Sequence, residues 1–131
     1  MPIDLHLTSE RILVPPRPGV DGGTGAWVEF FGLVRREEGG AAIAALEYEA
    51  YPEMAKLEMR RVLETLVQRF PCQCVVAIHR VGLVPVGEAA IYVGVAARHR
   101  GEAFGLLSAF MDELKRSVPI WKRGAVMVKD Q

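Results

Sequence analysis

Two long stretches with the apolar spacing of amphipathic helices constrain this chain more than any other feature. In residues 52–70 apolar side chains recur every three or four positions, Pro52 suits the first position of a helix, and Pro71 ends the run. Residues 100–117 show the same spacing, and Pro119 lies just past their end. We therefore predict two amphipathic helices.

The segments around these helices have the spacing of β-strands. Polar and apolar residues alternate, or short apolar runs are bounded by turn residues, in 3–8, 26–34, 42–51, 72–81, 89–97 and 125–128. Strands outnumber helices, so we predict an α+β fold, an antiparallel sheet with the two main helices on one face. We expect one domain over residues 1–131.

The connections between these elements carry turn and loop signals. Proline and glycine cluster in 15–25, 35–40 and 82–87. Gly39-Gly40 lies in the second of these segments and marks a tight turn. The strands on either side of it, 26–34 and 42–51, are therefore expected to form a hairpin.

Composition excludes several classes of function. The chain has 131 residues, with 16 Lys+Arg against 16 Asp+Glu, and 50% of its residues are apolar. A formal net charge of zero argues against nucleic acid as a partner, because nucleic-acid binders carry a basic excess. The longest uncharged apolar stretch, residues 89–97, is far shorter than the roughly 18–20 residues that span a bilayer, so we expect no membrane association.

The expected location is the cytoplasm. The first residues, Met1-Pro2-Ile3-Asp4, lack the basic and long apolar regions of a signal peptide. Cys72 and Cys74 are one residue apart on a predicted strand, where a disulfide between them would be strained. Free thiols suit a reducing compartment, and we expect both to pack as small hydrophobic side chains rather than to react.

The most informative region for function is residues 98–123. The sequence lacks the signatures of nucleotide-binding loops, serine hydrolases and zinc sites. In residues 98–123, three acidic side chains oppose six basic ones, namely Arg98, Arg100, Lys115, Arg116, Lys122 and Arg123. A neutral protein with one basic region predicts a site for an anionic small molecule or a carboxylate terminus.

Two places in this region suggest chemistry. His99 and Arg100 stand at the start of the second helix, where free backbone N–H groups and the helix dipole favour an anion; the alternative is a solvated helix start. Lys115 and Lys122 bracket Pro119-Ile120-Trp121. Partial desolvation there would make a lysine a usable acid, base or nucleophile, whereas the alternative is that both lysines extend from a helix end into solvent.

Several short motifs, in order and spacing, match one family. They are Phe31-Gly32-Leu33-Val34-Arg35, Tyr51-Pro52-x-Met54, Ile78-His79-Arg80-Val81-Gly82, Val93-Gly94-Val95, His99-Arg100 with Ala103-Phe104, and Met111-Asp112-x-Leu114-Lys115 leading to Pro119-Ile120-Trp121-Lys122-Arg123. With these motifs the chain resembles the MoaE-like large, catalytic subunits of molybdopterin synthase. The resemblance covers about residues 26–123.

This resemblance implies a specific activity. The family converts cyclic pyranopterin monophosphate into molybdopterin by inserting two sulfurs as a dithiolene, in molybdenum cofactor biosynthesis. The sulfur arrives on the C-terminal Gly-Gly thiocarboxylate of a small ubiquitin-like partner, whose tail enters a pocket of the large subunit. Large subunits form a homodimer with one small subunit at each end. The implied fold is an α/β hammerhead, with neither a metal nor a cofactor.

The resemblance also implies roles for individual residues. Lys115 and Lys122 are expected to be catalytic. Substrate binding falls to Arg35, His99 and Arg100, which suit a cyclic phosphate. The pocket for the partner's tail is expected to include Phe31, Met111, Trp121 and Arg123. The segment Arg36-Glu37-Glu38-Gly39 is more acidic than the family pattern, and Gly124 stands where an acidic residue is usual.

Helix geometry predicts a site shared between two subunits. Arg100 and Lys115 are 15 residues apart on one helix, which separates their backbones by about 22 Å. A homodimer that places the helix start of one subunit near Lys115 of the other would bring both groups to one substrate. Two alternatives stay open: a non-catalytic module that binds acidic peptide tails through the basic region, and an unrelated phosphoester-processing enzyme that uses His99 and Arg100.

Overall fold

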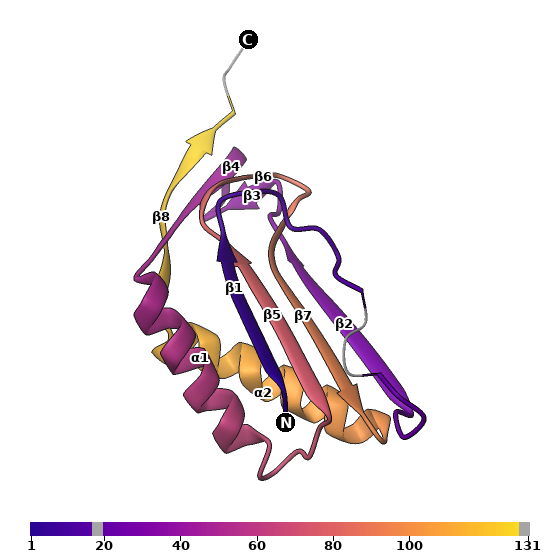
Figure 1. Ribbon diagram of the computed structural model, residues 1–131. Helices are drawn as coiled ribbons and strands as arrows, with labels where there is room; N and C mark the ends of the chain where they lie inside the picture. Colours follow the sequence, from indigo (N-terminus) through magenta and orange to yellow (C-terminus); the bar gives the residue numbers. More distant parts are fainter. Residues whose placement is uncertain (17–19, 129–131) are drawn as a thin grey trace.

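The computed structural model describes residues 1–16 and 20–128, which form two α-helices and eight β-strands (Figure 1). The helices are α1 (Pro52–Leu66) and α2 (Arg100–Ser117). The strands are β1 (Ile3–Thr8), β2 (Ala26–Leu33), β3 (Glu37–Glu38), β4 (Ala41–Ala50), β5 (Cys74–Arg80), β6 (Gly82–Pro85), β7 (Ala89–Ala97) and β8 (Ile120–Met127). This architecture confirms the predicted α+β class with two main helices.

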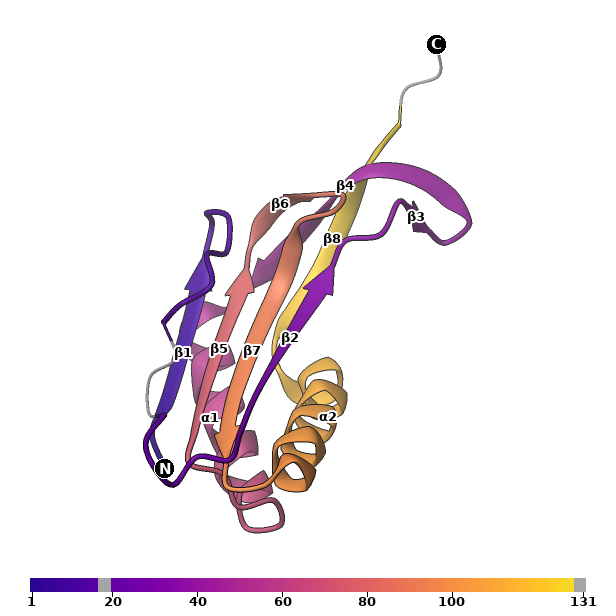
Figure 2. The ribbon, with the colours of Figure 1, turned by 90° about the vertical axis from the view of Figure 1, so that its right-hand side faces the viewer.

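The larger sheet has the strand order β1-β5-β7-β2. β1 runs parallel to β5 and the other neighbours are antiparallel, so the sheet is mixed rather than purely antiparallel. Both helices pack on one face of it (Figure 2), as predicted. Their apolar sides and that face form the main core, in which Met59, Leu63, Val93, Leu106 and Phe110 are almost completely buried.

The opposite face of this sheet is also covered, which explains the unbroken apolar run of β7. The segment between β1 and β2, described for residues 9–16 and 20–25, crosses this face (Figures 1 and 2). The Thr24 hydroxyl fastens it by donating to the side-chain oxygen of Gln73. Trp27 lies directly over Gly94, where an added Cβ would meet its ring at 2.8 Å. A glycine at residue 94 therefore lets the indole approach the sheet.

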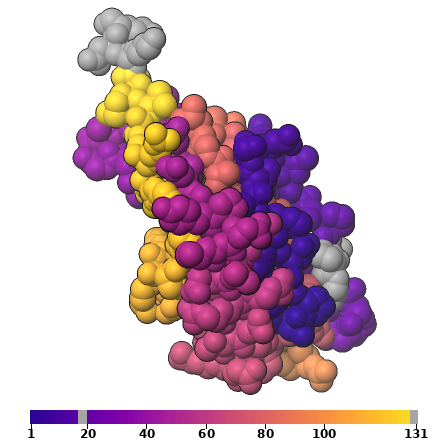
Figure 3. All heavy atoms as spheres, turned by 60° about the vertical axis from the view of Figure 1, so that its left-hand side comes forward, coloured from indigo at the N-terminus to yellow at the C-terminus, as the bar shows by residue number. Residues whose placement is uncertain are grey.

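The second sheet is built around β4. β3 pairs with the start of β4, β6 pairs with its middle, and β8 pairs along its other edge. A small separate core of Val34, Ile43, Leu46, Val84 and Ala90 lies beneath it. β8 and the strand paired with it, β4, project from the body of the molecule (Figures 1 and 3), and seven of the eight residues of β8 are exposed.

The predicted hairpin between 26–34 and 42–51 is wrong. β2 pairs with β7 in the larger sheet, whereas β4 belongs to the second sheet. The connection between them is longer than a tight turn because it holds β3, which pairs back on β4. Sheet partners are chosen by long-range packing, and a turn signal alone does not determine them.

Several element boundaries also differ from the prediction, and β5 begins at Cys74, so Cys72 lies before the strand rather than on it. The turn expected near 82–87 begins with β6, and the last strand starts at Ile120 rather than at residue 125. α1 ends at Leu66 rather than at residue 70, because the N–H groups of Gln68 and Arg69 tighten into i→i+3 bonds, the second to the Leu66 carbonyl at 3.0 Å. Phe70 still packs on the main core, so the helical spacing continues past the helix. Of the predicted loop 15–25, residues 17–19 lie outside the described residues.

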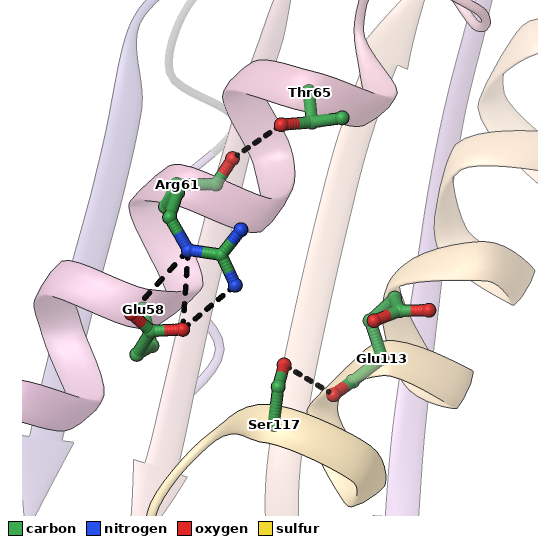
Figure 4. Close-up of polar contacts among 5 residues, drawn as sticks. All are labelled: Glu58, Arg61, Thr65, Glu113 and Ser117. Atoms are coloured by element: carbon green, nitrogen blue, oxygen red, sulfur yellow. Dashed lines mark hydrogen bonds and ion pairs between the residues drawn. The ribbon is translucent and has the colours of Figure 1, made fainter.

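Polar contacts on the helices lie away from the main core (Figure 4). Arg61 of α1 donates to Glu58 at 2.8 Å, and Thr65 donates to the Arg61 carbonyl at 3.0 Å. On α2 the Ser117 hydroxyl donates to the Glu113 carbonyl at 3.1 Å, one turn from the helix end. These contacts satisfy charged side chains and backbone carbonyls at the surface, and the buried faces of the helices remain apolar.

Candidate active site

A cavity of about 670 Å³ lies where the two sheets meet the C-terminal half of α2. Seven elements of the chain contribute to its wall: the end of β2 with the residues after it, β3, β4, β5, the start of β7, the C-terminal half of α2 and the start of β8. Five of the nine residues predicted for the site line it: Arg35, Met111, Lys115, Trp121 and Lys122. The cavity is thus the place where the predicted site converges.

The two predicted catalytic lysines reach the cavity from different elements. Lys115 lies in the last turn of α2, which ends at Ser117, and Lys122 is the third residue of β8. Pro119 separates the two elements and turns the chain, because proline cannot continue the helix ladder. Both lysine side chains are exposed, which matches the alternative in which they extend into solvent. Within the described residues Lys115 has no ion-pair partner, whereas Lys122 Nζ lies 3.1 Å from Glu38 Oε1.

Arg35 supplies a third cation to the cavity. It follows β2, whose pairing with β7 shifts register between Gly32 and Leu33. An added Cβ at Gly32 would lie 2.7 Å from Ile91 Cγ2, so a side chain would not fit at this irregularity. The chain leaves the sheet here and carries Arg35 to the cavity wall. Arg35, Lys115 and Lys122 therefore face a cavity in which Glu38 is the one lining carboxylate among the described residues.

Aromatic and thioether side chains form the apolar part of the wall. Met111 is half-buried against the main core, and the ring of Trp121 lies 5.1 Å from that of Tyr51. Two residues predicted for the partner-tail pocket lie outside the cavity. Phe31 packs its ring 5.1 Å from Tyr92, and Arg123 lies 3.6 Å from Glu47 and 3.8 Å from Glu49.

His99 and Arg100 do not line this cavity. His99 is the residue before α2 and Arg100 is its first residue, so both stand at the end of the helix opposite to Lys115. Both are exposed, and in the described residues neither forms an ion pair. One chain alone does not bring these two residues together with the lysines.

Besides apolar residues of the wall, sequence reasoning missed three polar residues that line the cavity: Glu38, Tyr48 and His79. Burial raises the pKa of Tyr48, which the nearby Lys122 charge opposes. Burial also lowers the pKa of His79, while a hydrogen bond of the ring to a backbone carbonyl opposes this shift. The Tyr48 and His79 rings meet edge-on with centroids 5.2 Å apart. His79 lies within a motif that carried the family resemblance, and that motif was the available signal.

The two cysteines are distant from this chemistry. Cys74 is 3% exposed, and burial together with the Glu102 charge raises the pKa of Cys72 to about 11. Neither lines the cavity. Within residues 1–16 and 20–128, no three histidine, cysteine or acidic side chains come together as a metal site. No helix in the described chain is long and apolar enough to cross a membrane.

Comparison with known proteins connects this cavity to one family. Residues 2–117 match the family described as MoaE protein. The chain is 46% identical over 100 residues to the molybdopterin synthase catalytic subunit of Pyrococcus abyssi, covering 76% of this chain and 68% of that protein. It is 40% identical over 99 residues to the catalytic subunit of Homo sapiens, covering 76% of this chain and 53% of that protein. The matched part of the chain thus spans 53–68% of the length of these two relatives.

Solved structures share the fold. A crystal structure of molybdopterin synthase from Staphylococcus aureus superposes with a TM-score of 0.82 at 25% identity, covering 95% of this chain and 91% of that one. A complex of subunits 1 and 2 of molybdopterin-converting factor from Helicobacter pylori contains a chain of the same fold, with a TM-score of 0.65 at 19% identity over 98% of this chain and 91% of that one. With its fold, its cavity and a family match over most of its length, the chain belongs to the MoaE protein family.

Proposed function

We propose that this chain is the catalytic subunit of a molybdopterin synthase. It converts cyclic pyranopterin monophosphate into molybdopterin by dithiolene formation, and the sulfur comes from the C-terminal thiocarboxylate of a small ubiquitin-like partner. The observation that carries this proposal is the convergence of Arg35, Lys115 and Lys122 on one cavity, in a chain of the MoaE family.

The charge of the cavity supports an anionic substrate and an anionic tail. Arg35 presents a planar set of donors that matches a phosphate, and the two ammonium groups supply mobile point charges. A cavity of about 670 Å³ has room for a pterin-sized molecule together with a narrow peptide tail. The attached phosphate would be held near Arg35, and the tail would enter alongside Met111 and Trp121.

The lysines suit the chemistry of the proposed reaction. Opening the cyclic phosphate and expelling oxygen both require a proton or a positive charge next to the leaving oxygen. Lys115 and Lys122 supply such groups from opposite sides of one turn. The nucleophilic sulfur arrives on the partner, so Cys72 and Cys74 have no role in this reaction, in agreement with their absence from the cavity wall.

The remaining site residues require other protein chains. A partner is supported by the Helicobacter pylori complex, in which two subunits of molybdopterin-converting factor are bound together. Phe31 and Arg123, which lie outside the cavity, are proposed to contact this partner beyond its tail. His99 and Arg100 are proposed to complete the substrate site of a second large subunit in a homodimer. The free thiols suit the reducing cytoplasm as the place of reaction.

A coupled assay tests this function. The chain is mixed with a thiocarboxylated partner and cyclic pyranopterin monophosphate, and molybdopterin is measured. We expect Lys115→Ala and Lys122→Ala each to lower turnover by roughly a hundredfold or more. Arg116→Ala is the matched control, since Arg116 is the neighbour of Lys115 but pairs with Glu113 at 2.8 Å outside the cavity. Tight partner binding without molybdopterin formation by the wild type would favour a non-catalytic binding module instead.

A further inference from the structure

We propose that His79 is a substrate-binding residue, whose Nε2 atom accepts a hydrogen bond from an N–H group of the pterin ring. This inference rests on the proposed function, because it concerns the substrate of the same cavity. It assigns to His79 a role that the three cationic residues of the cavity cannot perform, because guanidinium and ammonium groups only donate hydrogen bonds.

The position of His79 in the sheet brings its side chain to the cavity. It lies near the end of β5, paired with Ile91 of β7, and its side chain points to the helix side of the sheet like Val75 and Ala77. At this end of the sheet the helices no longer cover that face, and the cavity takes their place (Figure 2). His79 is only 6% exposed, yet it lines the cavity. A bound molecule would therefore meet the ring where little water remains.

The protonation state of the His79 ring leaves Nε2 able to accept a hydrogen bond. His79 Nδ1 lies 2.8 Å from the Arg80 carbonyl oxygen, which can only accept, so Nδ1 carries the proton and donates. In the neutral ring Nε2 then holds a lone pair. Burial lowers the pKa of His79 and so favours this neutral form. In the described part of the chain Nε2 has no hydrogen-bond partner.

The other polar groups of the cavity wall are mostly hydrogen-bond donors. The charged and titratable groups that line it with His79 are Arg35, Glu38, Tyr48, Lys115 and Lys122. The guanidinium and ammonium groups only donate hydrogen bonds, and the Glu38 carboxylate is already paired with Lys122 at 3.1 Å. A pterin ring carries an amide N–H and an amino group, which lose water on binding and need acceptors. His79 is a buried, neutral residue whose Nε2 has no protein partner in the described chain, and this atom meets the need for an acceptor.

A purely structural role makes a different prediction. If His79 only stabilised the fold, it would act through two contacts: the hydrogen bond from Nδ1 to the Arg80 carbonyl and the edge-on contact with Tyr48. Asparagine places an amide near the position of Nδ1 and has nothing at Nε2, whereas glutamine places its amide near the position of Nε2. His79→Asn therefore keeps the bracing hydrogen bond and removes the acceptor, and His79→Gln does the reverse.

Calorimetric titration of the full chain tests the proposal. Anaerobic cyclic pyranopterin monophosphate is the probe for the whole site, and inorganic phosphate is the probe for the cationic part alone. We expect His79→Asn to weaken pterin binding about tenfold and to leave phosphate binding unchanged. His79→Gln should bind the pterin more tightly than His79→Asn. Thermal melts establish that each variant is folded.

A measurement on the unaltered protein covers the case in which the variants do not fold. With ¹⁵N-labelled histidine, NMR titration should shift the Nε2 resonance of His79 when the pterin binds, and phosphate alone should not shift it. An unmoved Nε2 resonance, wild-type pterin affinity in folded His79→Asn, or equal losses of pterin and phosphate binding would overturn the role of His79. If the wild type binds phosphate but no pterin, the proposed function itself fails, and the inference fails with it.

Discussion

Lys122 Nζ of β8 lies 3.1 Å from Glu38 Oε1 of β3, and this pair stands at the wall of the cationic cavity. The two residues are 84 positions apart in the chain. Glu38 lies in the acidic segment 36–39, and its carboxylate pairs with one of the two proposed catalytic lysines. An incoming anion must compete with Glu38 for Lys122.

We predict that Glu38→Gln strengthens anion binding in the cavity. The Lys122 and Glu38 side chains are 48% and 36% exposed, so loss of their pair should change the free energy of unfolding by less than about 1 kcal/mol. The Kd for inorganic phosphate, measured by calorimetry at low salt, should fall several-fold. Glu37→Gln is the matched control, because Glu37 occupies the same short strand, does not line the cavity and has no ion pair among the described residues. An equal effect of both substitutions would show that only the net charge matters.

His79 should make the stability of the protein depend on pH. Burial lowers its pKa below the ordinary value of 6.5, so below that pH the unfolded chain binds a proton that the folded chain does not. The stabilisation is present above pH 6.5 and is lost as the pH falls through the folded pKa. Chemical unfolding between pH 7.5 and 5 should therefore show a smaller loss of stability for His79→Asn than for the wild type. Equal losses of stability in the wild type and in His79→Asn over this range would contradict the prediction.

We predict that Cys72 and Cys74 are spectators. At pH 8 a thiol whose pKa is about 11 is ionised in only about one molecule in a thousand, so Cys72 should react slowly with iodoacetamide. The double variant Cys72→Ala/Cys74→Ala is expected to lose some stability, since Cys74 is buried, but to keep its turnover per folded molecule. Mass spectrometry of the alkylated protein and the coupled assay check the two parts. Complete loss of activity in a folded double variant would indicate a sulfur relay through this chain.

We predict that the active site is composite. Arg100 and Lys115 lie at opposite ends of α2, 15 residues and about 22 Å apart, and only Lys115 lines the cavity. Mixing inactive Arg100→Ala protein with inactive Lys115→Ala protein should restore part of the activity, because some mixed dimers would hold one intact site. The coupled assay after subunit exchange measures this restoration. If the subunits exchange and no activity returns, both groups must serve a single chain.

Local pattern alone was enough to predict the helices and most strands. The bounds of α2 agree with the prediction because its apolar spacing, the following proline and the charged outer face all lie within one short stretch of sequence. β1 and β7 agree for the same reason, since alternation or an unbroken apolar run is a local property. The basic segment around α2 and β8 also indicated Lys115 and Lys122 as candidate site residues without any knowledge of the fold.

Only the tertiary structure decided which strands pair and which residues share the cavity. The segments 26–34 and 42–51 were both predicted to be strands of one hairpin, but packing placed β2 and β4 in different sheets, since pairing depends on partners distant in sequence. That separation opens the cavity between the sheets, and it brings Glu38 and His79 beside Lys115 and Lys122. Glu38 has no local pattern that marks it as a site residue, and His79 has only its place in a motif of the family resemblance. Their role follows from burial and proximity, which arise when the whole chain folds.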